Sequence, residues 1–327
     1  MIRSGLDLGP LGPLLADVAV SEVMVNGPGR PVWIERAGLL ECTDLVLDRV
    51  AVELAVERIA APLGLRVDRT RPAVDARLPD GSRVHIVVPP LAVDGPCITI
   101  RRFVVRAVAL AELCPAGVDE LLASAIAQRR NVLVVGATAS GKTTLLNALA
   151  AAVGAGERII TVEDAAELDL HHPHVVRLEA RAGSGAGTST VRELLRNALR
   201  MRPDRLVVGE IRGAEALDLL IAMNTGHDGA LATLHANGAA EALSRLETLA
   251  LLAGSGLPLP ALRSQVASSL DLVVHVARGG AGRRGVVEVR EVDPDPGGPG
   301  HLLADLGGVR AAPCRPPRIR VDGVRGP

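Results

Sequence analysis

The sequence predicts an α/β protein with two domains, a smaller α+β domain followed by a larger domain in which strands and helices alternate. The chain has 327 residues, which is more than a single domain usually contains. Residues 73–102 contain short apolar runs separated by turn residues, and such runs favour a group of strands. From residue 118 onward, strand patterns alternate with helical ones, which is typical of a mainly parallel sheet.

Changes in composition and pattern set the expected domain boundaries. We expect the α+β domain over residues 1–104 and a linker over residues 105–117. The larger domain is expected over residues 118–293. Residues 294–327 are rich in proline and glycine, so we expect them to form a loosely ordered tail.

Local patterns predict the main elements of both domains. Turn residues between two apolar runs predict a hairpin over residues 23–34. Residues 48–61 place apolar side chains on one helical face, and Asp48 is the expected N-cap. Further strands are expected over residues 74–78, 83–88, 97–102, 132–135, 158–162, 175–178 and 206–208, with a closing hairpin from 273–277 and 286–292.

The composition argues against several classes of protein. Trp33 and Phe103 are the sole aromatic residues and the net charge is −1, so neither base stacking nor a general attraction to nucleic acid is expected. The four cysteines form no C-x-x-C pair, which favours free thiols in a reducing compartment. No signal peptide or membrane-spanning run is visible, so we expect a cytoplasmic protein.

The segment GATASGKTT at residues 136–144 matches the pattern G-x-x-x-x-G-K-[ST]. An apolar strand precedes it and a helical pattern follows, which is the context that a phosphate-binding P-loop requires. Backbone N–H groups and a helix N-terminus favour anions, so the segment predicts ATP binding. Lys142, the single lysine of the chain, would reach the β- and γ-phosphates, and Thr143 would bind Mg²⁺. The expected nucleotide-binding residues are Gly136, Ala137, Thr138, Ala139, Ser140, Gly141, Lys142, Thr143 and Thr144.

Hydrolysis also needs an acid beside the P-loop, and two strand ends supply candidates. Glu210 follows the apolar run LVVG, from where it can reach a water in line with the γ-phosphate. Glu163 ends the strand that follows the P-loop helix, and it could polarise water or hold Mg²⁺ directly or through water. The alternatives are a glycine-rich turn that binds nothing and acids that are merely solvated strand-end charges.

At this point the residues resemble a known family, the ATPases of type II and type IV secretion systems. The resemblance is closest to the CpaF-like motors of Flp (tight-adherence) pili. It rests on ordered segments that contain the P-loop, the acidic box with Glu163, the strand with Glu210 and the histidine box. These segments are residues 136–144, 159–168, 197–213 and 225–237, together with residues 25–28, 75–83 and 98–103 nearer the N-terminus.

The resemblance implies a RecA-like ATPase domain preceded by a PAS-like domain, and a hexamer that binds ATP and Mg²⁺. It places the protein at the inner face of the cytoplasmic membrane, next to embedded platform proteins of a pilus or secretion system. By the same resemblance, four arginines of the first domain approach the nucleotide in cis or in trans, and two histidines sense the γ-phosphate or bridge to a neighbouring subunit. These residues are Arg77, Arg83, Arg101, Arg102, His227 and His235. The alternatives are surface ion pairs for the arginines and strand-end hydrogen bonding for the histidines.

Two departures from the family pattern leave other functions open. The family usually has glycine where this chain has Ala137 and Ala139, and alanine at a position that needs φ > 0 costs about 1 kcal/mol or more. One alternative is therefore a nucleotide-binding scaffold that does not hydrolyse ATP. Another is a DNA-coupled conjugation ATPase of the same superfamily, although the missing basic excess argues against it.

Overall fold

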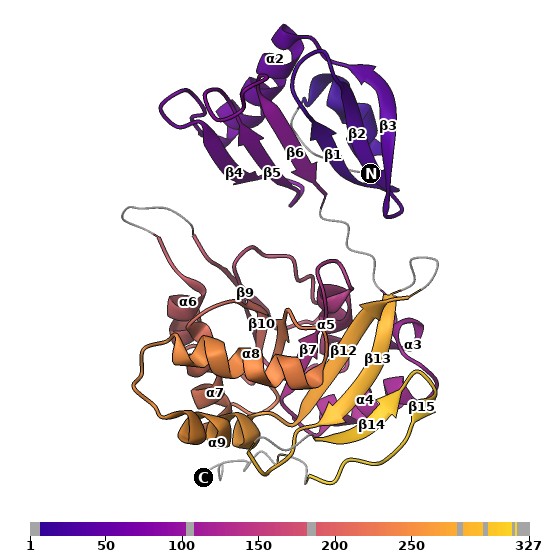
Figure 1. Ribbon diagram of the computed structural model, residues 1–327, viewed down its shortest axis with the longest axis vertical. Coiled ribbons are helices and arrows are strands. Elements are labelled where there is room, and N and C mark those ends of the chain that lie inside the picture. Colours follow the sequence, from indigo (N-terminus) through magenta and orange to yellow (C-terminus); the bar gives the residue numbers. More distant parts are fainter. Residues whose placement is uncertain are drawn as a thin grey trace. The chain divides into compact units, whose positions relative to one another are not determined.

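The computed structural model describes residues 7–102, 108–181, 188–279, 284–296, 300–315 and 318 (Figure 1). The chain divides into two compact units, Met1–Arg106 and Ala107–Pro327. Phe103, residues 105–107 of the expected linker and residues 319–327 of the expected tail lie outside the described part. The fold class is the predicted one, because a mostly parallel α/β unit follows a smaller α+β unit.

The first unit is built on an antiparallel sheet in the strand order β3-β2-β1-β6-β5-β4. The predicted hairpin over residues 23–34 and the strands predicted over residues 74–78, 83–88 and 97–102 all belong to this sheet. Strand β3 is not predicted by the pattern, since none of its side chains is buried. The strands are β1 (Val20–Val25), β2 (Pro31–Arg36), β3 (Leu39–Val46), β4 (Ala73–Arg77), β5 (Arg83–Val87) and β6 (Cys97–Arg101); the short helices are η1 (Gly9–Leu11), α1 (Gly12–Ala16) and η2 (Ala61–Leu63).

Helix α2 (Arg49–Ala60) covers one face of this sheet. Its buried residues Val52, Val56 and Ile59 follow helical spacing and pack in one cluster with the inward side chains of the strands. The Asp48 side chain accepts a hydrogen bond of 2.7 Å from the backbone N–H of Ala51. The predicted helix and its N-cap are thus confirmed.

The second unit is built on a nine-stranded sheet in the order β15-β14-β13-β12-β7-β11-β10-β8-β9. The strands from β12 to β9 in this order are parallel, and the remaining three pair antiparallel at one edge. The strands are β7 (Val132–Val135), β8 (Ile159–Glu163), β9 (Val175–Glu179), β10 (Arg205–Ile211), β11 (Leu231–Leu234), β12 (Leu272–Arg278), β13 (Arg284–Glu291), β14 (His301–Asp305) and β15 (Gly308–Val309).

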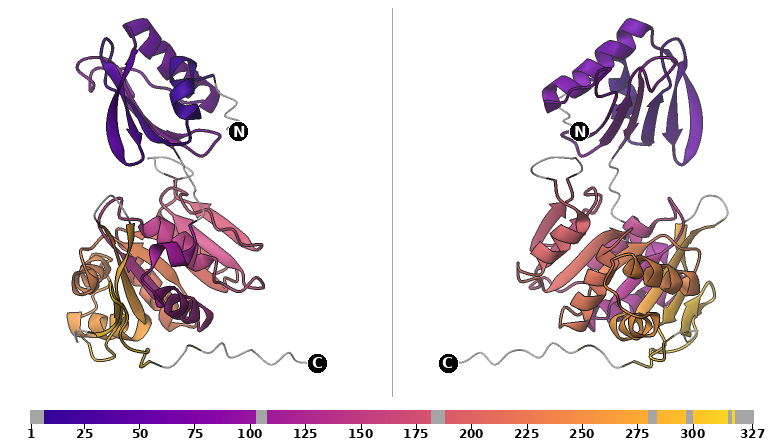
Figure 2. Two further views of the ribbon diagram at one scale, coloured as in Figure 1. Left: turned by 90° about the vertical axis from the view of Figure 1, so that its right-hand side faces the viewer. Right: turned by 60° about the vertical axis from the view of Figure 1, so that its left-hand side comes forward.

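Helices cover both faces of this sheet (Figure 2). Successive side chains of β7 point to opposite faces, so Val132 and Val134 pack with one helical layer while Leu133 and Val135 pack with the other. The first layer contains α3 (Leu110–Leu113), α4 (Val118–Ala127) and α5 (Lys142–Ala150); the second contains α6 (Val191–Ala198), α7 (Glu215–Asn224), α8 (Ala239–Leu251) and α9 (Leu259–Ser269). None of the described helices has the length and apolar character needed to cross a membrane.

The region after residue 294 differs from the expected loose tail where the structure describes it. Strand β14 pairs with β13, and its residues Leu303 and Ala304 are buried. Arg315 and Arg318 donate hydrogen bonds to backbone carbonyls at the end of α9, which have no partner within the helix. Proline and glycine content alone could not reveal these contacts, because they depend on which surface the segment meets.

The capping contact of α2 predicts a measurable loss of stability. Asp48→Ala removes the side-chain acceptor and should lower the free energy of unfolding by about 1 kcal/mol, whereas Asp48→Asn should be nearly neutral. Trp33, the single tryptophan, lies on β2 in the same unit, so its fluorescence during denaturation reports this unit. Equal midpoints for the alanine and asparagine variants would show that the cap contributes nothing.

Candidate nucleotide-binding site

Two glycines shape the loop between β7 and α5. A methyl group placed on Gly136 would lie 2.3 Å from the carbonyl oxygen of Val276 on β12, so this position tolerates no side chain. Gly141 has a φ of 104°, in the left-handed region that glycine adopts without strain. Residues 137–139 between them are exposed. The base of the loop is therefore packed against β12, while its tip is accessible to a ligand.

The two alanines that replace the family's glycines differ in backbone conformation. Ala139 has a φ of 58°, whereas Ala137 does not have a positive φ. The expected strain of about 1 kcal/mol therefore applies to Ala139 alone. The loop keeps its path at this cost, because the glycines at both of its ends are present.

Lys142 begins α5, and its ammonium points back into the loop. Its Nζ donates to the carbonyl oxygens of Gly136 and Ala137 at 3.0 and 2.9 Å, and it lies 3.2 Å from Nδ1 of His235. Three N–H groups thus have three partners. Burial lowers the pKa of Lys142, and the nearby carboxylate of Glu210 opposes that effect.

His235 connects Lys142 to the acid of the neighbouring strand. Its Nε2 lies 2.6 Å from Oε1 of Glu210. An ammonium can only donate, so Nδ1 accepts from Lys142 and the ring hydrogen lies on Nε2, facing the carboxylate. Burial lowers the pKa of His235 below its usual 6.5, and the charge of Glu210 opposes this shift. The hydrogen-bond pattern and the direction of the shift both favour a neutral imidazole.

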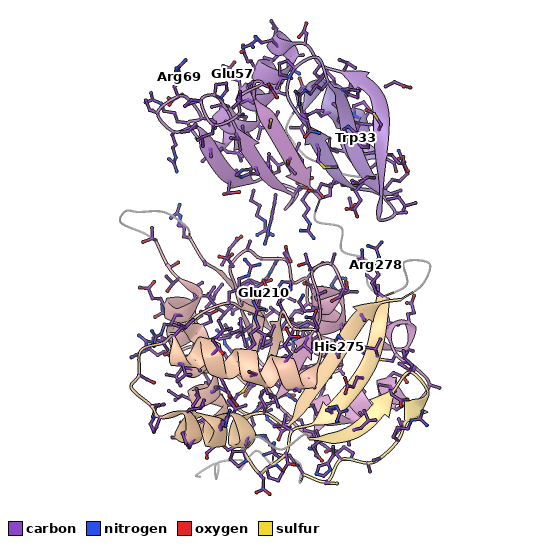
Figure 3. All side chains as sticks on the ribbon, in the orientation of Figure 1. Trp33, Glu57, Arg69, Glu210, His275 and Arg278 are labelled. Carbon is purple, nitrogen blue, oxygen red and sulfur yellow. The ribbon has the colours of Figure 1, made fainter. Side chains whose placement is uncertain are left out.

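Glu210, labelled in Figure 3, lies on β10. Its carboxylate joins two groups of the site. One carboxylate oxygen faces His235, and the other accepts a hydrogen bond from Nε of Arg212. Arg212 is also 3.6 Å from the carboxylate of Asp164, which follows β8. The structure therefore brings the predicted residues Lys142, His235 and Glu210 into one continuous set of contacts.

Glu163 lies deeper than a solvated strand-end acid. Its side chain is 2% exposed, and Oε1 accepts two hydrogen bonds of 2.8 Å from the backbone N–H groups of Glu167 and Leu168. Oε2 has no hydrogen-bond partner among the described residues. Burial raises the pKa of Glu163 to about 7, although the two backbone N–H groups oppose this. Glu163 is therefore a proton-binding carboxyl at the same edge of the sheet as Glu210.

The first turn of α5 carries oxygen donors that suit a magnesium ion. Thr143 and Thr144 are half-buried there, next to the loop. The described residues contain no group of three or more histidine, cysteine or acidic side chains that could hold a metal alone. Mg²⁺ commonly uses one or two protein oxygens together with phosphates and water, so the hydroxyl of Thr143 fits it as one such oxygen.

His227 is not brought into this set of contacts. It precedes β11, whereas His235 follows β11 at the opposite end of the strand. Because β11 and β7 are parallel and Leu231 pairs with Val132, His227 lies near the amino-terminal edge of the sheet. Its position supports no contact with a phosphate in the P-loop of the same subunit.

The four predicted arginines belong to the first unit, where three of them form a row. Arg77, Arg83 and Arg101 are register partners on the adjacent strands β4, β5 and β6. Arg102 instead donates to the backbone carbonyls of Asp17 and Val20, which secures the segment that leads into β1. The row places three guanidinium groups on one face of the sheet, and Arg102 has a structural contact of its own.

Two features of the site escaped sequence reasoning. One is the close approach of Val276 to Gly136, which depends on β12 lying beside β7. The other is Gly209, where a methyl group would lie 2.8 Å from Cγ of Glu163. A glycine directly before Glu210 was the available signal, but only the strand order shows which side chain it accommodates.

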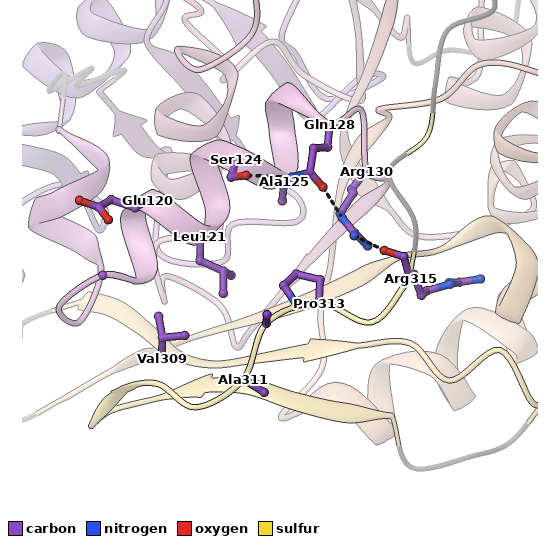
Figure 4. A pocket seen from close by; sticks show the side chains of 12 residues that line it. Glu120, Leu121, Ser124, Ala125, Gln128, Arg130, Val309, Ala311, Pro313 and Arg315 are labelled. Atoms are coloured by element: carbon purple, nitrogen blue, oxygen red, sulfur yellow. Dashed lines mark hydrogen bonds between the residues drawn. The ribbon is translucent and has the colours of Figure 1, made fainter.

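A cavity on another part of this unit is lined by none of these residues (Figure 4). It measures about 520 Å³ and separates α4 from residues 309–315. The guanidinium of Arg130 at its edge bonds Gln128, Glu291 and the backbone carbonyl of Arg315. Because these polar groups satisfy one another, the cavity offers no comparable chemistry.

Comparison with known proteins places the chain in a family. Residues 5–295 match the family described as Type II/IV secretion system protein. The chain belongs to this family. A putative conjugal transfer protein of Mycobacterium tuberculosis is 43% identical over 295 residues, covering 86% of this chain and 83% of that protein. The conjugal transfer protein TrbB of Rhizobium radiobacter is 36% identical, covering 85% of this chain and 84% of TrbB.

The chain shares its fold with a solved structure. The X-ray structure of the Legionella pneumophila ATPase DotB aligns with a TM-score of 0.64 at 22% identity, covering 86% of this chain and 79% of DotB. The type II/IV secretion part of the predicted resemblance is thus confirmed. Its narrower part stays a prediction, since these relatives are named for conjugal transfer and do not single out CpaF-like motors of Flp pili.

The buried carboxyl of Glu163 predicts a pH dependence of stability. Its pKa of about 7 lies above the usual 4.5, so the folded chain holds the proton more tightly than the unfolded chain. The contribution of this group to stability is therefore complete below about pH 4.5 and is lost as the pH rises through about 7. Glu163→Gln cannot ionise, so it should be more stable than the wild type at about pH 8, by at most about 3 kcal/mol.

Denaturation of both proteins between about pH 5 and pH 8 measures this difference. Glu120→Gln, which removes an exposed acid on α4, is the matched control and should follow the wild-type profile. Parallel profiles for Glu163→Gln and the wild type would contradict a buried, proton-binding Glu163.

Proposed function

We propose that this protein is a Mg²⁺-dependent ATPase that powers a secretion, conjugation or pilus system. The observation that supports this best is the contact chain from Lys142 through His235 to Glu210. It connects the residue that would hold the phosphates to the acid that would activate water. A glycine-rich turn that binds nothing has no need of a buried ammonium in such contacts.

In this proposal the backbone of residues 136–144 and the ammonium of Lys142 hold the triphosphate. Lys142 would exchange its contacts with Gly136, Ala137 and His235 for phosphate oxygens, which recover the charge stabilisation that burial removes. Thr143 would hold Mg²⁺, with Glu210 and Glu163 acting directly or through water. The ion would neutralise charge that develops on the phosphates.

Glu210 is proposed to orient and activate the attacking water. It is 16% exposed and belongs to the contact chain, whereas Glu163 is 2% exposed and bonds backbone groups. Glu163 is therefore assigned an assisting role as a proton-binding carboxyl. His235 would couple phosphate binding to the activation of water. A phosphate that draws Lys142 away leaves Nδ1 of the ring without its donor, and Nε2 of the same ring faces Glu210.

The assembly is proposed from the family and from the row of arginines in the first unit. A hexamer at the inner face of the cytoplasmic membrane, working with membrane-embedded platform proteins, fits a family of secretion proteins. Arg77, Arg83 and Arg101 are proposed to approach a nucleotide in cis or in trans, as arginine fingers that make hydrolysis depend on domain closure. Arg102 is proposed to support them through its backbone contacts.

Three finer proposals differ in the system that the protein serves and in whether it hydrolyses ATP. The ordered segments of the sequence favour a motor of the Flp pilus type, whereas the names of the relatives favour conjugal transfer. A DNA-coupled ATPase is therefore the second candidate. A scaffold that binds ATP without hydrolysis is the third, and the strained Ala139 is the observation that favours it.

Glu210→Gln tests the central role. The change preserves the shape of the side chain but removes its basicity, so phosphate release should fall about 10²- to 10⁴-fold while ATP binding persists. Glu288→Gln, an acid of β13, is the control and should retain turnover. A Glu210→Gln protein with wild-type turnover would remove this residue from the mechanism, and a wild type that binds ATP without turnover would favour the scaffold.

Added DNA discriminates between the first two candidates. The net charge of −1 offers few phosphate contacts, so we expect phosphate release to be the same with and without single- or double-stranded DNA. The comparison should be made at about 50 mM and about 200 mM salt, because phosphate contacts weaken steeply over that range. Stimulation that disappears at the higher salt would favour the DNA-coupled ATPase.

A further inference from the structure

The hairpin of β12 and β13 flanks the P-loop on the side opposite β11. Strand β12 is parallel to β7, with His275 beside Val135, so the end of β12 extends past the loop. Arg278, at the end of β12, and Arg284, at the start of β13, are register partners across the hairpin. Figure 3 shows Arg278 at the end of the strand, beyond His275. The P-loop therefore lies between the strand that leads to His235 and the strand that leads to Arg278.

This hairpin is in direct contact with the loop. Besides the approach of Val276 to Gly136, a methyl group on Gly141 would lie 3.4 Å from Cβ of Arg284 and 3.6 Å from its Cδ. The aliphatic part of Arg284 thus passes over the residue that precedes Lys142. Because Gly141 directly precedes α5, the stem of Arg284 lies beside the start of that helix.

A cavity of about 350 Å³ separates the hairpin from the tip of the loop. Ala137, Thr138 and Ser140 line one side of it, and residues 275–278 and Asn237 line the rest. Ser140 is 2% exposed, and its Oγ has no hydrogen-bond partner among the described residues. A buried hydroxyl without a partner is costly, so this cavity contains a polar group that a ligand could satisfy.

The charges around the cavity favour an anion. Arg278 and Arg284 face each other directly across an antiparallel pair, where like charges destabilise the sheet. Neither guanidinium forms an ion pair within the described part of the chain. The two acids whose charges act on the neighbouring His275 have other partners, since Glu288 pairs with Arg290 and Glu241 bonds Asn237. An anionic group beside the P-loop would relieve this repulsion.

We propose that Arg278 and Arg284 form a second phosphate-binding element, which grips the terminal phosphates of the nucleotide held by the P-loop. Guanidinium groups bind phosphate oxygens in a planar, bidentate manner that a lysine ammonium does not reproduce. Lys142 and the two arginines would then hold the phosphates from the two sides of the loop, and Ser140 would add a hydroxyl contact. This inference rests on the proposed function.

Equilibrium binding of ATP and ADP by the full chain tests the proposal. Arg278→Gln and Arg284→Gln should each weaken ATP binding about tenfold, and the double variant should weaken it further. The loss should be larger for ATP than for ADP, and larger at low salt than at high salt. Arg290→Gln is the matched control, because Arg290 lies on β13 with Arg284 but pairs with Glu288. This variant should bind ATP as the wild type does.

The thermal unfolding of each variant separates a binding role from a structural one. Weakened ATP binding by the double variant, with an unchanged unfolding temperature, would support the proposal, and Arg278→Lys should recover only part of the loss. Wild-type affinity in the double variant, or a loss of affinity matched by Arg290→Gln, would overturn it. If the wild type binds no ATP, the proposed function fails. The arginine site is then judged by pyrophosphate binding in the same variants, and equal binding overturns it.

Discussion

One imidazole ring joins the ammonium of Lys142 to the carboxylate of Glu210, and the chemistry proposed for this protein depends on that contact. The contact exists because β7, β11 and β10 are neighbours in a parallel sheet, so the residues that follow them meet at one edge. Strand β7 leads through Gly136 to the loop and Lys142, β11 leads to His235, and β10 carries Glu210. The nine-stranded sheet is thus the frame of the site, and the helical layers hold its strands in register.

Burial acts on the ionisable groups of this edge in a consistent way. It lowers the pKa of Lys142 and of His235 and raises that of Glu163, so it favours the neutral form of each. A bound triphosphate would counteract this for Lys142, because it brings negative charge to a poorly solvated ammonium. Because burial disfavours the charged forms of these groups, an anion that binds here should change which of them hold a proton.

The sequence was sufficient for the local features and insufficient for those that depend on strand order. The P-loop, its flanking strand and helix, and the acids at two strand ends follow from patterns within about twenty residues. The positions of His227 and His235 on either side of β11 follow from where that strand begins and ends, and its exact limits are hard to read from a run of four residues. The contact of Val276 with Gly136 and the packing of the segment after residue 300 join distant parts of the chain, so no local pattern could predict them.

The protonation of His235 tests the central claim most directly. In protein labelled with ¹⁵N at histidine, the signals of His235 can be assigned by their absence from a His235→Gln variant. At neutral pH the ring should be neutral, with its hydrogen on Nε2 facing Glu210 and with Nδ1 as an acceptor. ATP should change the Nδ1 signal, because Lys142 leaves it for the phosphates. A ring protonated on both nitrogens, or one with its hydrogen on Nδ1, would contradict the contact chain on which the account rests.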